Sequence, residues 1–542
     1  MRPTTTRSVL LLLLATAVGC EGSMTPPPLL TVTSPQRSMT QGTARQIVVQ
    51  GTAVPGPAGD PVLGVTVNKV PATLAADGSF SATVDLPPGA MLLETVAMAQ
   101  GGGAATDARA VQVGELRPVG AGIERAVTAA LSADAFARLS AAAGPLVKAM
   151  DLSALLAPLQ PMANLGDSIA NAQLSITRLA FGDVRIELTP VAGGLDVAVE
   201  LDALSAAASV HYDGALIPEG TTTVAITADR VTIAGTLVVT PAGTAGFTTR
   251  LASPTVHTTN LVLAASGLVG QILDLLNANL ASTIQDVTTR SAEAALEPLI
   301  NAALGALAGP QRIDVLGKTL ALQASPSAIA FTTAGALVTM NVQAKLAGSE
   351  VSPGYIFTPN GTPALDVGNG IQLGLADDLI NELLAEVHAL GLLDLHLHQD
   401  FGLFDDAEIK LTMPPMISAS TGDGSMRLVL GDMIATFTDH GAPVISAAIN
   451  AQVDLAILRG TSAQQVALQF GKVDLFVNVL DPASGVGGEE LAGAASSGIG
   501  LQLDSLSQFL ITVPVPAIAG VSLDNLALHT DSGYVVVSGD IH

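Results

Sequence analysis

The chain has 542 residues, of which 49% are hydrophobic, 13% charged and only 3% aromatic, with no tryptophan and a formal net charge of −25. Because acidic residues repel phosphates and base stacking needs aromatic side chains, this composition excludes a nucleic acid partner. A chain of this length holds several domains and buries enough apolar surface to fold without disulfides.

Residues 1–19 have the pattern of a lipoprotein signal peptide. Arg2 and Arg7 give a basic start, Val9 to Leu14 form a short apolar segment, and Ala17-Val18-Gly19-Cys20 is a lipobox. The apolar segment is too short to span a membrane permanently. We therefore expect cleavage before Cys20.

Cys20 is the only cysteine in the chain, so it has no partner for a disulfide. We expect it to carry acyl chains such as palmitate and to anchor a bacterial lipoprotein, because several chains on one residue hold a protein firmly. Glu21 is not the aspartate typical of lipoproteins kept at the inner membrane, which favours the outer membrane, on its periplasmic or cell-surface side. The alternative is an incidental thiol left after ordinary signal cleavage.

Residues 20–28 form a proline-rich leash, and residues 29–115 predict an all-β sandwich. Short alternating runs such as RQIVVQGTA and SFSATVDL are separated by turns such as Ala76-Asp77-Gly78. The stretch GVTVNKVPATLAADGSFSATVDLPPGA resembles bacterial immunoglobulin-like repeats. That resemblance implies a spacer, with an adhesive role as the alternative.

Residues 121–345 predict strands on both sides of one very long helix. Ser132 to Met150 predicts a short opening helix, and LSITRLAFGDVRIEL, GLDVAVEL and TTVAITADRVTIAGTLVVT predict strands after it. Ser266 to Ala308 then has apolar residues at steps of three and four, which predicts an amphipathic helix of roughly 60 Å if unbroken. We expect a kink or break at Pro298 and an end at Gly309-Pro310, before the strands in KTLALQ, AIAFTT and ALVTMNVQAKL.

Residues 346–542 repeat the pattern with weaker signals. A helix is expected at about Ala376 to Leu390, N-capped near Asp377 or Asp378, with an apolar stripe and Gly391 past its end. Its stripe consists of Leu379, Ile380, Leu383, Leu384, Val387 and Leu390. Later features are a Met413-Pro414-Pro415 turn, a glycine-containing helix near Glu489 to Phe509 and a final strand pair from Leu523 to Ile541.

Strands, a very long helix and more strands form an uncommon order. In this order, and in the stretches Ser132 to Met150 and Leu276 to Leu304, the chain resembles the bactericidal/permeability-increasing and lipid-transfer protein family, the tubular lipid-binding fold. The resemblance implies an α+β fold with two elongated barrels, 121–345 and 346–542, each a highly curved antiparallel sheet wrapped on a long helix, joined by a central sheet. The disulfide of the animal members is missing here, and Gln285 stands where one of its cysteines would be placed.

The resemblance also implies a non-enzymatic lipoprotein that holds phospholipid-like amphiphiles in apolar slots between helix and sheet, with lipid transfer as an extension. Small residues in the second half of the long helix either leave room for acyl chains or let the sheet pack closely. The alternative is a structural or adhesive surface module with collapsed barrels and no ligand. The candidate slot residues are Phe136, Leu139, Val269, Ile272, Leu276, Leu280, Ala294, Ala295, Leu383 and Val387.

Charge argues against recognition of lipopolysaccharide headgroups. Residues 346–542 contain 4 basic and 23 acidic side chains, and residues 121–345 contain 11 and 17, with no basic cluster in either part. An anionic headgroup would therefore be repelled.

No motif for catalysis is present: there is no Gly-x-Ser-x-Gly elbow, phosphate loop or His-Glu-x-x-His. We therefore expect no enzymatic activity and no cofactor. Strand alternation places Asp394, His396, His398 and Asp400 on one face, where they are weak candidates for zinc ligands, and a solvated strand face is the competing interpretation. A calcium loop formed by Asp400, Asp405, Asp406 and Glu408 competes in the same way with an acidic surface loop.

The lipobox gives a direct test. Cys20→Ser is expected to move the protein from the membrane fraction to the soluble fraction, because it removes the only acylation site, and to leave its circular dichroism unchanged. Fractionation and immunoblotting measure the distribution, and persistent membrane association of the variant would contradict the anchor.

Overall fold

The computed structural model describes most of the chain beyond residue 25. The described ranges are 26–149, 160–161, 163–166, 171–215, 217–265, 309–368, 370–398, 404–419, 426–459, 466–480 and 523–541, with single positions inside 272–301 and 491–503. The signal peptide, the acylation site Cys20, the kink at Pro298 and the candidate residues Val269, Leu280, Ala294, Ala295 and Asp400 lie outside the described residues. The chain divides into two units, one of residues 1–36, 46–85 and 93–108 and one of residues 37–45, 86–92 and 109–542.

The first unit consists of antiparallel strands. Its four-stranded sheet has the order β1-β3-β7-β6, and β4 pairs with β5 and β8. Buried and exposed residues alternate along β3, and Val49, Val67 and Phe80 lie in the core. The strands predicted in this block are present, and the immunoglobulin-like identity stays a prediction. The strand bounds are β1 Leu29–Ser34, β3 Gln46–Val54, β4 Val62–Val67, β5 Val70–Pro71, β6 Thr73–Leu74, β7 Ser79–Asp85, β8 Gly89–Ala99 and β9 Ala104–Val113.

The second unit contains a sheet of unusually long strands. β15 and β16 have 21 and 25 residues and pair antiparallel along most of their length, whereas strands of roughly 3–10 residues are usual. The strand order is β12-β13-β15-β16-β17, with β14 against β15 and β18 against β16. The bounds are β12 Ala163–Gly166, β13 Asn171–Ala180, β14 Asp183–Val191, β15 Gly194–Gly214, β16 Ile217–Pro241, β17 Phe247–Thr259 and β18 Val262–Ala265.

A local irregularity at Ala203 divides this sheet into two parts. β14 pairs with β15 on one side of Ala203 and β13 pairs with it on the other, and Ala203 has a φ of 50°. The buried side chains of β15 fall at odd positions up to Leu201 and at even positions from Leu204. Such irregularities bend a strand and increase its twist. Because the buried positions change from odd to even numbers at Ala203, the aliphatic side chains stay on the buried face beyond the bend.

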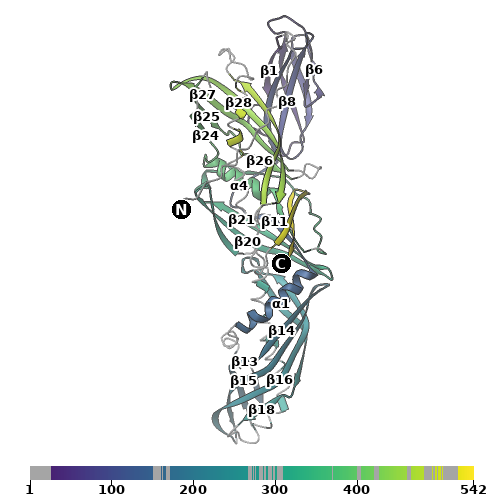
Figure 1. Cartoon of the computed structure of the whole chain (residues 1–542), viewed down its shortest axis with the longest axis vertical. Helices are drawn as coiled ribbons and strands as arrows, with labels where there is room; N and C mark the ends of the chain where they lie inside the picture. Colours follow the sequence, from purple (N-terminus) through teal and green to yellow (C-terminus); the bar gives the residue numbers. More distant parts are fainter. Residues whose placement is uncertain are drawn as a thin grey trace, which may run out of the picture. The chain divides into compact units, whose positions relative to one another are not determined.

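Helices cover the aliphatic face of this sheet. α1, Ala133–Ala149, lies against β14 (Figure 1), and the Ser140 hydroxyl accepts a hydrogen bond from the Leu188 N–H at 2.8 Å. Every described position between 272 and 301 is helical, as the amphipathic pattern predicts. The Asn301 side chain pairs with both the N–H and the C=O of Phe247 at 2.8 Å, so the end of this helical stretch is fixed to β17.

A second sheet of this unit takes strands from both predicted halves. Its order is β19-β20-β21-β11-β23-β31-β30, and β11 pairs with β21 on one side and β23 on the other. This is the arrangement expected of a central sheet that joins two halves. The bounds are β11 Ile123–Ser132, β19 Gly309–Val315, β20 Lys318–Thr332, β21 Gly335–Leu346, β23 Ile371–Ala376, β30 Leu523–Asp531 and β31 Tyr534–Ile541.

A third sheet has the order β24-β25-β27-β28-β29, with β26 against β27. It shares an apolar core with α4, Asp377–Ala389, and with the second predicted helix, whose described positions between 491 and 503 are all helical. Leu491, Ala495 and Ile499 are buried there at steps of four, as one helix face requires. The bounds are β24 Leu395–His398, β25 Asp406–Lys410, β26 Met416–Ser418, β27 Met426–Asp439, β28 Ala442–Arg459 and β29 Val466–Val479.

Short elements complete the second unit. β2 pairs in parallel with the end of β9, and β10 pairs with β22. Taken together, the described fold is mostly β with few helices, and its arrangement as two barrels stays a prediction. Among the described residues, no helix is both long and apolar enough to cross a membrane. The remaining bounds are β2 Met39–Thr40, β10 Glu115–Arg117, β22 Tyr355–Phe357, and the 3-10 turns η2 Gly243–Ala245 and η3 Ser349–Val351.

The link between Asn301 and Phe247 is a testable part of this fold. Asn301→Ala removes two hydrogen bonds to the backbone of a buried residue, so the free energy of unfolding is expected to fall by about 1–3 kcal/mol. Chemical denaturation measures the change. Gln285→Ala, an exposed position of the same helical stretch, is the matched control and should change stability by less than about 0.5 kcal/mol. Equal effects of the two changes would contradict the assignment.

Candidate functional site

The described slot candidates lie in three apolar clusters. Phe136 and Leu139 of α1 belong to the largest cluster, in which the Phe136 ring lies 6.1 Å from that of Phe331. Ile272 and Leu276 pack in a separate cluster with residues of β13, β15 and β16. Leu383 and Val387 of α4 belong to the cluster of the third sheet. The structure therefore places each candidate on a buried helix face but does not bring the six residues into one group.

α4 differs from the expected helix at its start. Its N-cap is Ala376, which makes no side-chain capping bond, so the predicted cap at Asp377 or Asp378 is wrong. Both aspartates lie in the first turn and bind other segments: Asp377 accepts from the Ala419 N–H at 2.9 Å, and Asp378 from the Thr358 N–H at 2.9 Å. The predicted end is confirmed, since Gly391 has a φ of 64° and donates to the His388 carbonyl.

The polar side of α4 is buried. Asp378, Glu382 and Glu386 follow one another at steps of four, so their side chains share one face of the helix. Glu382 accepts a hydrogen bond from the Gly120 N–H at 2.6 Å, and Glu386 one from the Leu346 N–H at 2.8 Å. Carboxylates of a single helix therefore bind the backbone at Gly120, at Leu346 and at Thr358.

Burial changes the protonation of these carboxylates. Loss of water, together with the weaker effects of the like-charged neighbours Glu386 and Asp378, raises the pKa of Glu382 to about 8 against the lowering effect of the Gly120 hydrogen bond. Burial also raises the pKa of Asp378 and of Glu386 to about 7 and that of Asp377 to about 6. Among the described residues, Glu382 Oε2 has no hydrogen-bond partner. These groups therefore gain or lose protons near neutral pH.

Two further polar residues of α4 face the segment that contains the Pro-Pro turn. Asn381 donates to the Ile417 carbonyl at 2.9 Å and accepts from the Ile417 N–H at 2.8 Å, which fixes β26 to the helix. His388 Nε2 lies 3.1 Å from the Leu411 carbonyl oxygen. A carbonyl only accepts, so Nε2 carries the proton in this contact. Burial lowers the pKa of His388, which favours the neutral ring.

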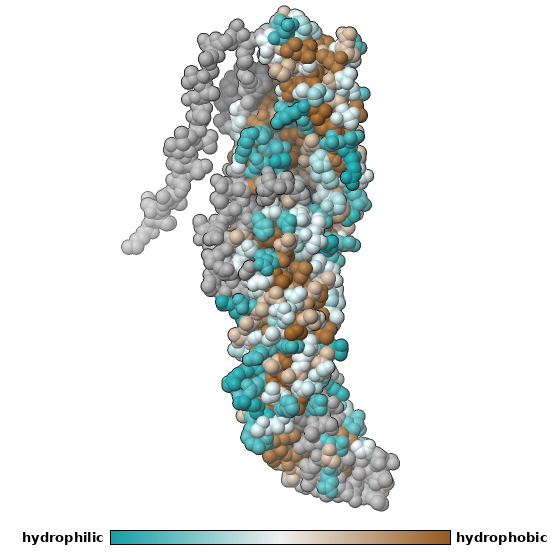
Figure 2. All heavy atoms as spheres, turned by 90° about the vertical axis from the view of Figure 1, so that its right-hand side faces the viewer, coloured by the Kyte–Doolittle hydropathy of each residue, from teal (hydrophilic) through white to brown (hydrophobic). Residues whose placement is uncertain are grey.

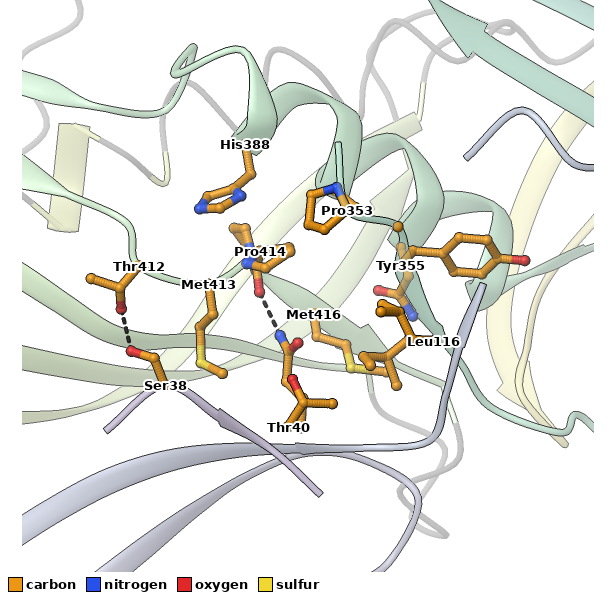
Figure 3. Close-up of a pocket in the computed structure, with 16 residues that line it drawn as sticks. Ser38, Thr40, Leu116, Pro353, Tyr355, His388, Thr412, Met413, Pro414 and Met416 are labelled. Carbon is orange, nitrogen blue, oxygen red and sulfur yellow. Dashed lines mark hydrogen bonds between the residues drawn. The ribbon is translucent and has the colours of Figure 1, made fainter. Parts of the chain in front are cut away.

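Between α4 and this segment lies a pocket of about 220 Å³. Figure 3 shows His388 on the helix and the Met413 and Met416 side chains between it and the strand segment that carries Ser38 and Thr40. The Met413-Pro414-Pro415 turn predicted from the sequence forms one wall. The lining residues are Ser38, Thr40, Gln112, Leu116, Pro353, Gly354, Tyr355, Ile356, Asn381, Ala385, His388, Thr412, Met413, Pro414, Pro415 and Met416.

Hydrogen bonds fix the segment that contains Ser38, one of the residues that line the pocket. Arg37 forms a salt bridge of 2.9 Å with Asp432, whose side chain is fully buried, and the Ser38 N–H donates to the same carboxylate at 2.6 Å. The Ser38 and Thr412 hydroxyls share a short hydrogen bond, and Gln112 donates to the Pro414 carbonyl at 2.7 Å. These bonds join the segment at Ser38 and the end of β9 to the segment from Thr412 to Pro414.

The polar strand face proposed for zinc is solvated. His396 and His398 point to the exposed side of β24 and lie 3.6 and 2.9 Å from the carboxylates of Glu408 and Asp406 on β25. Asp394 accepts from the Leu411 N–H. Within the described ranges, Asp405, Asp439 and His440 form the only group of three potential metal ligands whose ligand atoms lie within 4.8 Å of one another, and all three residues are exposed.

Comparison with known proteins finds only distant likenesses. No family model and no curated protein matches the sequence. The crystal structure of a lipopolysaccharide binding protein covers 78% of this chain and 99% of its own at 15% identity and a TM-score of 0.38. Two structures of P47 from Clostridium botulinum, types E1 and A2, also cover 78% of this chain and 100% and 99% of their own, at 8% and 6% identity and TM-scores of 0.29 and 0.26.

The pKa of Glu382 gives a pH prediction. Its folded-state value of about 8 lies above the ordinary 4.5, so the folded protein retains a proton that the unfolded chain releases. The free energy of unfolding is therefore expected to fall as the pH rises from about 4.5 to 8. Glu382→Gln keeps an acceptor for Gly120 and cannot ionise, so it should raise stability at pH 8.5 by on the order of 1–3 kcal/mol and change it little at pH 4.5.

Thermal unfolding at the two pH values measures this difference. Glu350→Gln is the matched control, because Glu350 is exposed, pairs with Lys345 at 3.1 Å and has a lowered pKa. The control should give no gain at pH 8.5. A loss of stability in Glu382→Gln that is the same at both pH values would contradict the assignment.

Proposed function

We propose that this protein binds lipids and catalyses no reaction. The observation that carries the proposal is the continuous aliphatic face of β15 and β16, which is far longer than an ordinary core needs. The buried aliphatic side chains of β16 run from Val224 to Val239, about 50 Å at roughly 3.3 Å per residue, whereas the acyl chains of one leaflet fill about half of a hydrocarbon layer of roughly 30 Å. The face is therefore longer than an acyl chain, and we propose that acyl chains lie against it beside the covering helices.

The energetics of this face favour exchange with a membrane. Each methylene buried against it is stabilised by about 0.8 kcal/mol relative to water, and a bilayer offers nearly the same. Extraction of a lipid is then close to neutral, and fit decides which lipid is held. We therefore propose phospholipid-like amphiphiles as ligands and lipid transfer as an extension of binding.

Charge narrows the class of lipid. The second unit contains an excess of acidic side chains, which is largest in residues 346–542 with 23 acidic against 4 basic. An anionic headgroup would meet repulsion there, so neutral or zwitterionic lipids are the preferred ligands.

The cellular setting follows from the N-terminal sequence. We propose a lipoprotein anchored at the outer membrane through Cys20, with the sandwich of residues 29–115 as a spacer between the anchor and the lipid-binding sheets. Its partners are then the membrane and its lipids, with no cofactor.

One observation favours the competing function, a structural or adhesive module with a filled interior. Phe136 and Ile272 are 1% and 0% exposed and lie inside packed clusters. An adhesive surface, however, needs an accessible apolar patch. On the face drawn in Figure 2, hydrophobic residues are interspersed with hydrophilic ones.

Photo-crosslinking separates the two functions. The mature chain with Cys20→Ser is incubated with vesicles of phosphatidylcholine that carries a diazirine on one acyl chain, irradiated, and digested for mass spectrometry. We expect adducts on buried residues of β16, such as Ile226, and none on the adjacent exposed Thr227. Adducts spread equally over both faces, or no adducts at all, would overturn lipid binding by this sheet and favour the filled module.

A further inference from the structure

We propose that the pocket beside α4 is a separate binding site for one alkyl chain of a neutral amphiphile. This inference rests on the proposed function for its class of ligand, lipid, and adds a site away from the long-stranded sheet. Its residues come from β2, β22, α4 and the Met413-Pro414-Pro415 turn, all in the second unit.

The size of the pocket fixes the size of the ligand. A volume of 220 Å³ exceeds the roughly 150 Å³ of an apolar cavity that holds benzene and is smaller than the roughly 300–1,000 Å³ of sites for drug-sized ligands. At about 30 Å³ for a group the size of a water molecule, it holds on the order of seven methylene-sized groups. A single chain, or the end of a longer one, fits this space, and a two-chain lipid does not.

The walls of the pocket suit an alkyl chain. Met413 and Met416 supply flexible thioether side chains, which adapt to ligands of irregular shape. Leu116 also lines the pocket yet is 56% exposed, so it offers apolar surface at the opening that a bound chain would cover. Ile356, Ala385 and Pro415 complete the apolar lining.

His388 contributes a neutral ring to the wall of the pocket. Because its Nε2 proton is directed to the Leu411 carbonyl, the neutral ring presents Nδ1 as a lone-pair acceptor. Within the part of the chain that the structure describes, this buried Nδ1 has no hydrogen-bond partner. Because Nδ1 has no accessible surface and the ring is neutral, His388 gives the pocket an uncharged wall and no counter-charge for an anion.

An anionic group does not fit the same position. None of the lining residues is lysine or arginine, and Arg37 nearby is already paired with Asp432. Asp394, whose charge acts on His388, adds negative charge near the site. A carboxylate or phosphate headgroup would be desolvated without a counter-charge. The ligand is therefore a fatty alcohol, a monoacylglycerol or an N-acyl amide.

The test compares two probes with the same chain. The mature chain with Cys20→Ser is titrated calorimetrically with monododecanoylglycerol and with dodecyl phosphate, both below their critical micelle concentrations. We expect saturable binding of the glycerol ester at one site and at least tenfold weaker binding of the phosphate. Equal affinities would overturn the preference for a neutral headgroup, and no binding of the ester would overturn the site.

Two variants of α4 locate the binding. Ala385→Leu adds volume inside the pocket and should reduce the affinity for monododecanoylglycerol at least tenfold. Ala389→Leu is the matched control, because Ala389 lies one helical turn further on and does not line the pocket, and its affinity should not change. Equal effects of the two variants would contradict binding in this pocket.

Methionine labelling tests the site without any substitution in the pocket. In protein with ¹³C-labelled methionine methyl groups, the ester should shift the signals of Met413 and Met416, and it should leave that of Met340, which is buried in another cluster, unchanged. A shift of Met340 alone would contradict the pocket. If phosphatidylcholine forms adducts on β16 but the ester does not shift the Met413 and Met416 signals, only the pocket is refuted. If the ester shifts these signals but no adducts form on β16, only lipid binding by β16 is refuted.

Discussion

The second unit depends on one constraint: the aliphatic face of β15 and β16, strands of 21 and 25 residues, has to be covered by other elements. α1 and the helical positions between 272 and 301 cover it: Ile272 and Leu276 pack against one part of the sheet, and Leu296 and Ile300 share the cluster of the other part with α1. The change of phase at Ala203 keeps the buried face aliphatic beyond the bend. The alternation of buried and exposed side chains in these two strands therefore explains why helices pack against the sheet. It is also the basis of the lipid-binding proposal.

A second constraint acts at α4, where an acidic helix face is buried. Each carboxylate binds a backbone N–H of a different segment, so the helix holds the loop at Gly120, the end of β21 and the segment at Thr358 in place. The cost of burying these groups depends on pH, whereas their hydrogen bonds specify which segments meet. The pocket lies on another side of the same helix, and its shape depends on this fixed position.

Periodicity in the sequence predicts the strands, α1, the helical positions between 272 and 301 and both ends of α4 within a few residues. It also places His396 and His398 on one exposed face. It fails for the buried side of α4, because two aspartates before an apolar repeat resemble an N-cap. Their real partners, Thr358 and Ala419, are distant in sequence. The pocket could not be predicted either, since it joins Ser38, Leu116 and Met413 through tertiary packing alone.

The central claim is that the folded protein holds lipid, and native mass spectrometry of the mature chain with Cys20→Ser tests it most directly. The protein is purified from its host without detergent or organic solvent and is then incubated with phosphatidylcholine vesicles. The predicted result is a mass above that of the polypeptide by one or more whole lipid molecules, which is lost on collisional activation. A spectrum that shows only the bare polypeptide mass, both as purified and after incubation, would contradict the claim.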